Sequence, residues 1–279
     1  MGTLLLVFTD LDGSLLDHHS YDYRDALPQL RRLARRGVPV IPASSKTRAE
    51  VERLREKLDL HGPFIAENGA AAFIPVGFFR VRPPSVEERD GFWVKAWSAP
   101  RHQWLEVLAG LRGEFADEFD CFSSAGSTGV MAMTGLSAAA AADANAREYS
   151  EPVKWLGSEQ RKQMFLERLR ARGASVLEGG RFLSVSGDCD KGRALKWLRG
   201  AFQREYPDRT IQDLAVGDGD NDIAMLEAAG TALLVRSPVH DFPRLARDEG
   251  VMCSTDYGPA GWAEGVARWL QGTATTLKT

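Results

Sequence analysis

The chain has 279 residues, 44% hydrophobic and 26% charged, which is typical of a folded globular protein and excludes a disordered one. Its net charge of −3 argues against a broad basic face for nucleic acid, and no apolar run approaches the roughly 18 residues of a membrane helix. Three widely spaced cysteines form neither a disulfide framework nor a zinc motif, so we expect a protein of the reducing cytoplasm without membrane or nucleic-acid partners.

The first part of the chain alternates predicted strands and helices. Residues 4–8 are a short apolar run with polar neighbours, as in a strand buried on both faces of a parallel sheet. An amphipathic helix that stops at Gly37 leads to a second strand at 38–43. A capping box at 47–50 starts the next helix, and residues 64–66 form a third strand. This order predicts an α/β fold with a Rossmann-like, doubly wound parallel sheet.

The alternation then stops for about a hundred residues. We expect residues 70–81 to form a β-hairpin, and residues 85–186 to form an inserted α+β domain. Gly179-Gly180 lies between two short apolar segments, which is a strong hairpin signal within this insertion. The remaining residues, 1–84 and 187–279, then make up the core. Helices are expected in the insertion at 101–112, 137–148 and 158–172.

The alternating order resumes near residue 190. It predicts a helix to about residue 205, then a strand, a helix and a further strand, with a last helix near residue 259. The two strands are expected at 212–216 and 231–235, and the helix between them at 220–229.

Acidic residues follow two of the predicted buried strands. Asp10 and Asp12 come directly after the first strand, and Asp218, Asp220 and Asp222 follow the strand at 212–216. Carboxyl ends of parallel strands form the ligand crevice of such a sheet, so these carboxylates are expected to meet there. Grouped carboxylates repel one another unless a cation lies among them, and Mg2+ prefers such oxygen ligands. An ordinary turn is the alternative reading of each cluster, which the presence of two clusters disfavours.

Polar residues after the other strands suit an anionic ligand. Ser44 and Ser45 precede a helix N-terminus, where a hydroxyl and free backbone N–H groups can bind phosphate. Lys191 opens another helix, an unfavourable place for a cation unless it offsets nearby negative charge. Glu67 and Asn68 end the third strand, and either a simple turn or a contact to substrate explains them.

Taken together, these motifs resemble those of the haloacid dehalogenase superfamily of phosphotransferases. The resemblance implies Mg2+ as cofactor and an aspartyl-phosphate intermediate, and an insertion between the second and third motifs implies a C2-type cap. In order along the chain, the motifs are Asp10 with Asp12, Ser44, Lys191, and Asp218 with Asp222.

The resemblance also implies a role for each motif. Asp10 would be the nucleophile and Asp12 the general acid and base. Phosphate would be held by Ser44, Ser45 and Lys191. The metal would be held by Asp10, the Asp12 carbonyl and Asp218, with Asp222 holding a metal-bound water.

Longer segments narrow the resemblance. FTDLDGSLLDHHSYD, SSKTRAE, FIAENGA, MTGLS, REYSEP, GGRF and CDKGRAL are similar to segments of mannosyl-3-phosphoglycerate phosphatases. This implies the substrate 2-O-(α-mannosyl)-3-phosphoglycerate, a small phosphorylated sugar acid. Arg147 in the insertion is a candidate for its carboxylate, although a solvated surface charge is an equal reading. Glucosyl-3-phosphoglycerate and sucrose phosphate remain alternative substrates. A phosphosugar mutase or a glycosyltransferase fits the motifs less well.

Overall fold

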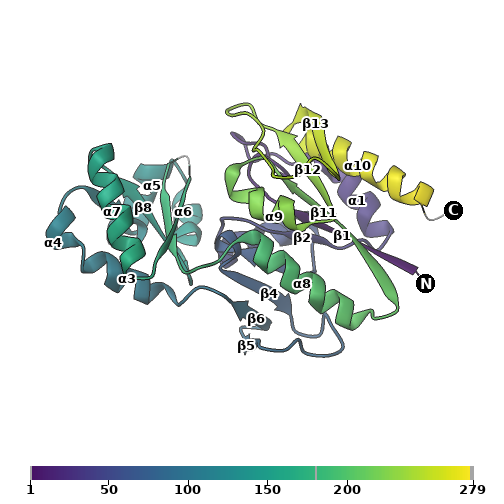
Figure 1. The fold of residues 1–279 in the computed structure, drawn as a ribbon, viewed down its shortest axis with the longest axis horizontal. Coiled ribbons are helices and arrows are strands. Elements are labelled where there is room, and N and C mark those ends of the chain that lie inside the picture. Colours follow the sequence, from purple (N-terminus) through teal and green to yellow (C-terminus); the bar gives the residue numbers. More distant parts are fainter. Residues whose placement is uncertain (1, 180, 277–279) are drawn as a thin grey trace.

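The computed structural model describes residues 2–179 and 181–276, and its largest layer is a five-stranded parallel sheet (Figure 1). The sheet order β13-β12-β11-β1-β2 places the first strand of the chain beside a strand from its last third. The fold class predicted from the sequence is confirmed. The strands are β1 (Gly2–Thr9), β2 (Val40–Pro42), β11 (Arg209–Gly217), β12 (Thr231–Arg236) and β13 (Val251–Tyr257).

Helices cover both faces of this sheet, which explains why β1 is apolar at every inner position. Leu5 and Val7 belong to one core, and Leu6 and Phe8 to the other. The first core also contains α1 (Leu27–Arg35), α2 (Arg48–Leu58) and α10 (Gly258–Thr276). The second contains α8 (Lys191–Glu205) and α9 (Ile223–Ala228). The helix expected at 220–229 divides into a short 3-10 turn, Asp220–Asp222, and α9.

A second, antiparallel sheet extends the core at the β2 side. β3 touches the parallel sheet through a single bridge between Ala43 and Ile65. The hairpin expected at 70–81 is wrong, because β4 pairs with β3 on one side and with β6 on the other. The order β3-β4-β6-β5 comprises β3 (Phe64–Ala66), β4 (Ala71–Pro75), β6 (Phe92–Ala96) and β5 (Glu87–Arg89).

Aromatic packing explains this pairing. The ring centroid of Phe73 lies 4.9 Å from that of Phe64 and 6.0 Å from that of Phe92, so one cluster joins β3, β4 and β6. Strands β5 and β6 fall in the range 85–186 predicted for the insertion, yet β6 pairs with the core strand β4, and β5 pairs with β6.

Residues 101–186, which we call the cap, form a separate group of helices and strands (Figure 1). Its antiparallel sheet has the order β7-β8-β10-β9 and packs on helices through a separate core that includes Trp104, Phe115 and Phe165. The strands are β7 (Phe119–Cys121), β8 (Glu151–Trp155), β9 (Ser175–Glu178) and β10 (Leu183–Ser186). The helices are α3 (Arg101–Ala109), α4 (Arg112–Phe115), α5 (Phe122–Thr134), α6 (Ala138–Asn145) and α7 (Glu159–Ala171).

The three helices predicted in the insertion are present as α3, α6 and α7. Helix α5 was not predicted, because its sequence is rich in serine and glycine and Gly126 interrupts it with a φ of 61°. The predicted hairpin of β9 and β10 is confirmed by their antiparallel pairing, while Gly180 of its turn lies outside the described residues. Among the helices that are described, none is long and apolar enough to cross a bilayer.

Candidate active site

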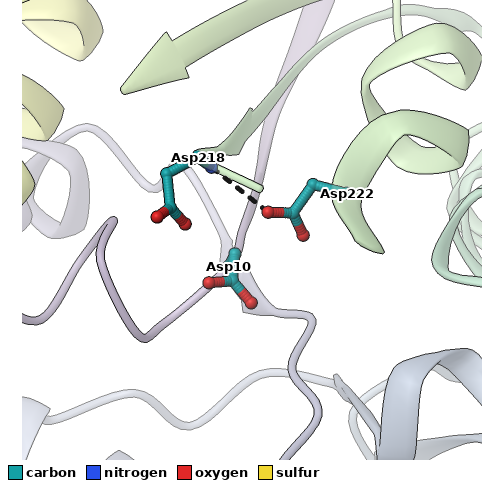
Figure 2. A group of neighbouring side chains, drawn as sticks. All are labelled: Asp10, Asp218 and Asp222. Atoms are coloured by element: carbon teal, nitrogen blue, oxygen red, sulfur yellow. Dashed lines mark hydrogen bonds between the residues drawn. The ribbon is translucent and has the colours of Figure 1, made fainter. Parts of the chain in front are cut away.

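Three buried carboxylates meet at the carboxyl edge of the parallel sheet, as the sequence predicted (Figure 2). Asp10 follows β1 and Asp218 follows β11, and these strands end side by side because Thr9 is in register with Val216. The Asp10 amide donates to the Val216 carbonyl at 2.8 Å. One oxygen from each of Asp10, Asp218 and Asp222 lies within 4.8 Å of the other two.

Lys191 supplies the positive charge within this cluster. Its Nζ lies 2.6 Å from Oδ1 of Asp10 and 2.7 Å from Oδ1 of Asp222, and its side chain is fully buried. Helix α8 holds the lysine in place, with Asp190 as its N-cap. A Cβ on Gly192 would lie 2.1 Å from the Ala224 carbonyl oxygen, so only glycine lets α8 approach α9 this closely.

The cluster carries more negative charge than Lys191 can offset. Burial, reinforced by the charge of Asp222, raises the pKa of Asp10 well above its usual value. Burial, and then Asp222, also raises the pKa of Asp218 to about 6. Oδ2 of Asp222 accepts from the backbone N–H of Asp218 at 3.2 Å (Figure 2). It also accepts from the Gly219 N–H at 3.2 Å, and the two bonds fix its carboxylate. Oxygen donors with excess negative charge fit Mg2+, so these residues suit the metal that was predicted.

Asp12 lies next to the cluster and pairs with a lysine that the sequence reading did not single out. Lys46 Nζ lies 2.8 Å from Oδ2 of Asp12 and 5.1 Å from the ring centroid of Tyr21. The other oxygen, Oδ1, is buried and has no hydrogen-bond partner among the described residues. Gly13 has a φ of +81°, and a Cβ there would lie 2.3 Å from Oδ2 of Asp218. The turn therefore needs glycine to bring Asp12 beside the carboxylates.

The loop predicted to bind phosphate, residues 43–47, lies between β2 and α2, and we call it the phosphate loop. Ser44 is buried, and its Oγ accepts from the Lys46 amide at 3.2 Å. The predicted capping box is present at the start of α2, where Thr47 and Glu50 bond each other's backbone N–H groups. Ser45 lies on the wall of the cavity described next.

A cavity of about 1040 Å³ connects the carboxylates to the cap. Its core side includes Asp10, Asp12 and Asp218, together with three histidines, His18, His19 and His240. The last of these places Nε2 at 3.5 Å from Oδ2 of Asp218. From the cap, the side chains of α5 and of the β9–β10 hairpin line it, including Phe122, Leu177, Arg181 and Phe182.

The three residues predicted to contact substrate have different surroundings. Asn68 lines the cavity, and its Oδ1 accepts from Asn221 Nδ2 at 3.3 Å. Arg147 also lines the cavity, close to the phosphate loop, since its Nη2 donates to the Ser45 carbonyl at 3.2 Å. Glu67 is only 1% exposed, and both of its carboxylate oxygens accept hydrogen bonds from residues 148–150.

The sequence analysis predicted no role for Lys46, His18 or His19. The only sequence signal for Lys46 was its place directly after Ser44-Ser45. His240 is about 230 residues from Asp10 in the chain and carries no motif, so only the fold reveals its position.

A doubly wound sheet thus has a buried carboxylate–lysine cluster at its carboxyl edge, and one cavity joins this cluster to the α+β cap, an arrangement that suits phosphoryl transfer. Residues 7–75 match the family model of the haloacid dehalogenase-like hydrolases. Over 258 residues the chain is 33% identical to the glucosyl-3-phosphoglycerate/mannosyl-3-phosphoglycerate phosphatase of Methanococcoides burtonii, covering 92% of this chain and 94% of that protein. The chain therefore belongs to the haloacid dehalogenase-like hydrolase family and is a phosphoric monoester hydrolase.

Solved structures support the fold. A sugar phosphatase of haloacid dehalogenase subclass IIB superposes with a TM-score of 0.62 at 15% identity, covering 95% of this chain and 98% of that one. The sucrose-phosphatase of Synechocystis sp., in complex with sucrose and phosphate, gives a TM-score of 0.59 at 15% identity, covering 96% and 98%. At such identities the likeness shows the fold alone.

Proposed function

We propose that the protein is an Mg2+-dependent phosphatase that hydrolyses 2-O-(α-mannosyl)-3-phosphoglycerate to mannosylglycerate and phosphate. The observation that carries the proposal is that core residues and cap residues line the same cavity. Asp10, Asp12 and Asp218 line it from the core and suit a phosphate with its metal, whereas Arg147 and other cap residues suit the sugar acid. The relative from Methanococcoides burtonii, named for glucosyl- and mannosyl-3-phosphoglycerate, supports the same substrate class.

In the first step, a carboxylate oxygen of Asp10 bonds to phosphorus as the bond from phosphorus to the alcohol oxygen breaks. Asp12 gives that leaving oxygen its proton. Water then attacks phosphorus, Asp12 takes a proton from it, and phosphate departs as Asp10 is restored. We assign both proton transfers to Oδ1 of Asp12. This oxygen has no hydrogen-bond partner among the described residues, whereas Oδ2 is paired with Lys46.

Charge in this site is balanced by several groups. Lys191 neutralises part of the carboxylate charge and, with Ser44 and Ser45, faces the phosphoryl oxygens. Asp10, Asp218 and the Asp12 carbonyl would hold Mg2+, and Asp222 would hold a water bound to it. When bound, Mg2+ offsets the charge of the carboxylates and of the phosphoryl group.

We assign recognition of the substrate carboxylate to Arg147. In a 3-phosphoglycerate the carboxylate and the phosphate stand at the two ends of a three-carbon unit, so a cation beside the phosphate loop can reach both. Arg147 donates to the Ser45 carbonyl from Nη2, and its buried Nε has no hydrogen-bond partner among the residues described. The sugar then extends toward the cap wall of Phe122, Arg181 and Phe182.

A panel of phosphate esters, assayed with and without Mg2+, tests the proposal. We expect mannosyl-3-phosphoglycerate or its glucosyl analogue to be hydrolysed with the highest kcat/KM, and chelation to abolish turnover. A higher kcat/KM for sucrose phosphate would instead select the alternative that the likeness to sucrose-phosphatase raises. Interconversion of two sugar phosphates without release of phosphate would establish a mutase.

Replacement of Arg147 by alanine tests the carboxylate assignment. Truncating one partner of a buried charge pair costs about 2–5 kcal/mol, so Arg147→Ala should lower kcat/KM for mannosyl-3-phosphoglycerate at least about tenfold. The ester p-nitrophenyl phosphate has no carboxylate and should lose much less. Arg168→Ala is the matched control, because Arg168 pairs with Glu114 within the cap. Equal losses on both esters, or none on either, would remove Arg147 from this role.

A cytoplasmic location stays a prediction from the sequence, supported by three free thiols, Cys121, Cys189 and Cys253.

A further inference from the structure

The backbone of Glu67 and Asn68 fastens the phosphate loop to the end of β3. The Glu67 amide donates to the Lys46 carbonyl, and the Asn68 amide donates to the Ser44 carbonyl, both at 2.9 Å. Both residues adopt left-handed conformations, with φ of 51° and 57°. Such conformations are uncommon for residues other than glycine, and they are kept where surrounding contacts fix the backbone.

The Glu67 side chain binds a different part of the chain. Oε1 accepts from the Glu148 amide at 2.8 Å, and Oε2 accepts from the Tyr149 amide at 3.2 Å and from Ser150 Oγ at 2.5 Å. These donors belong to residues 147–150, which join α6 to β8 of the cap and which we call the strap. One buried carboxylate therefore satisfies three donors of the strap.

Arg147, the first residue of the strap, contacts both Glu67 and the phosphate loop. Its Nη1 donates to Ser150 Oγ at 2.9 Å and lies 3.8 Å from Oε2 of Glu67. Its Nη2 donates to the Ser45 carbonyl. Glu67 thus contacts the phosphate loop through its backbone, the strap through its carboxylate, and the guanidinium at the cavity wall through charge.

We propose that Glu67 is a positioning residue that holds Arg147 and the strap in register with the phosphate loop. The inference rests on the proposed function, because it assigns the positioned guanidinium to the substrate carboxylate. Glu67 itself is 1% exposed and lies behind the strap, so it acts through Arg147. Its negative charge attracts the guanidinium, and its three accepted bonds fix the segment that carries it.

The variant Glu67→Gln tests this role with little change in shape. The amide turns an NH2 group toward donors, so at least one of the three strap bonds is lost along with the charge. For mannosyl-3-phosphoglycerate we expect kcat/KM to fall at least about tenfold, mainly through a higher KM. For p-nitrophenyl phosphate we expect a change of less than about threefold, because the phosphate loop keeps its backbone contacts.

Glu151→Gln is the matched control. Glu151 is also fully buried, but its carboxylate accepts from Arg101 Nε at 2.5 Å and from the Ser123 amide at 2.8 Å, both within the cap. We expect this variant to change both esters by similar factors. In the Arg147→Ala background, Glu67→Gln should add less than about twofold, because the positioned group is already gone.

Equal losses on the two esters in Glu67→Gln would show a merely structural role, and unchanged kinetics on both would show no role; either result overturns the proposal. Hydrogen exchange in the ligand-free protein tests the strap independently of substrate. The Glu148 and Tyr149 amides should exchange faster in Glu67→Gln than in wild type or in Glu151→Gln, and unchanged exchange would also overturn it.

Failure of the proposed function can be told apart from failure of this proposal. If only the proposed function is wrong, the wild type hydrolyses no phosphorylated sugar acid, but the Glu148 and Tyr149 amides still exchange faster in Glu67→Gln than in wild type. If Glu67→Gln does not fold, Ser150→Ala provides the test, because that hydroxyl links Glu67 to Arg147. It should raise KM for the sugar acid at least about threefold and leave p-nitrophenyl phosphate nearly unchanged. An unchanged KM for the sugar acid would refute the positioning.

Discussion

Replacing Lys191 by methionine should destabilise the protein and make its stability depend on Mg2+. Lys191 is fully buried, and its ammonium lies 2.6 Å from Asp10 and 2.7 Å from Asp222. Methionine keeps much of the side-chain volume and removes the charge. The three buried carboxylates then lose the ammonium that pairs with Asp10 and Asp222.

Breaking a buried ion pair by removing one partner costs about 3–5 kcal/mol. For a chain of this size each kcal/mol lowers Tm by roughly 2–4 °C, so Lys191→Met should unfold about 6–20 °C below the wild type in metal-free buffer. Mg2+ should raise the Tm of the variant more than that of the wild type, because the unpaired carboxylates attract a cation more strongly. Turnover should be lost in either buffer, because the phosphoryl group loses its ammonium.

Thermal unfolding at pH 7.5, with Mg2+ and with chelator, measures both effects. Lys196→Met is the matched control, since Lys196 stands on the same helix and is exposed. We expect the control to lie within about 0.5 kcal/mol of wild type, as surface substitutions do. If Lys191→Met unfolds within 1–2 °C of the control in chelator (roughly 0.5 kcal/mol), the charge balance argued for this cluster is wrong.

Three further outcomes follow from the same geometry. Asp10→Asn should keep its fold and lose turnover, because an amide is nearly isosteric but does not attack phosphorus; near-wild-type turnover would exclude Asp10 as the nucleophile. The pKa of Asp218 is raised to about 6, so protons compete with metal below that pH, and the Tm gain from Mg2+ should shrink between pH 7.5 and 5.5; a gain independent of pH would contradict this. Burial raises the pKa of Cys189 to about 11, so iodoacetamide should modify exposed Cys253 well before Cys189, as peptide mass spectrometry can check.

The core of the fold and the centre of the site were predictable because their signals are local. A strand with a buried C-terminal half, followed at once by an aspartate, describes both β1 and β11, and the geometry of a parallel sheet brings their ends together. The pairing of β6 with β4 was not predictable in this way. It depends on contact among Phe64, Phe73 and Phe92, which lie on three strands separated by turns.

Residue roles at the cap side depend on contacts distant in the sequence, which explains why they were harder to predict. Nothing next to Lys46 in the chain indicates that it pairs with Asp12. Nothing next to Glu67 indicates that its donors come from residues about 80 positions later. The sequence therefore placed Glu67 and Asn68 together as possible substrate contacts, whereas the fold turns their side chains to different surroundings.

Hydrogen bonding of buried polar atoms further distinguishes the role of Glu67 from those of Asp12 and Arg147. Glu67 is 1% exposed, and its carboxylate accepts three hydrogen bonds from the strap. Asp12 and Arg147, by contrast, line the cavity, and Asp12 Oδ1 and Arg147 Nε are buried without a hydrogen-bond partner within the part of the chain that is described. Buried polar atoms without partners are costly in a folded protein unless a ligand, ion or water satisfies them. One is an acceptor suited to a proton and the other a cationic donor suited to a carboxylate, so both match the chemistry of a phosphorylated acid.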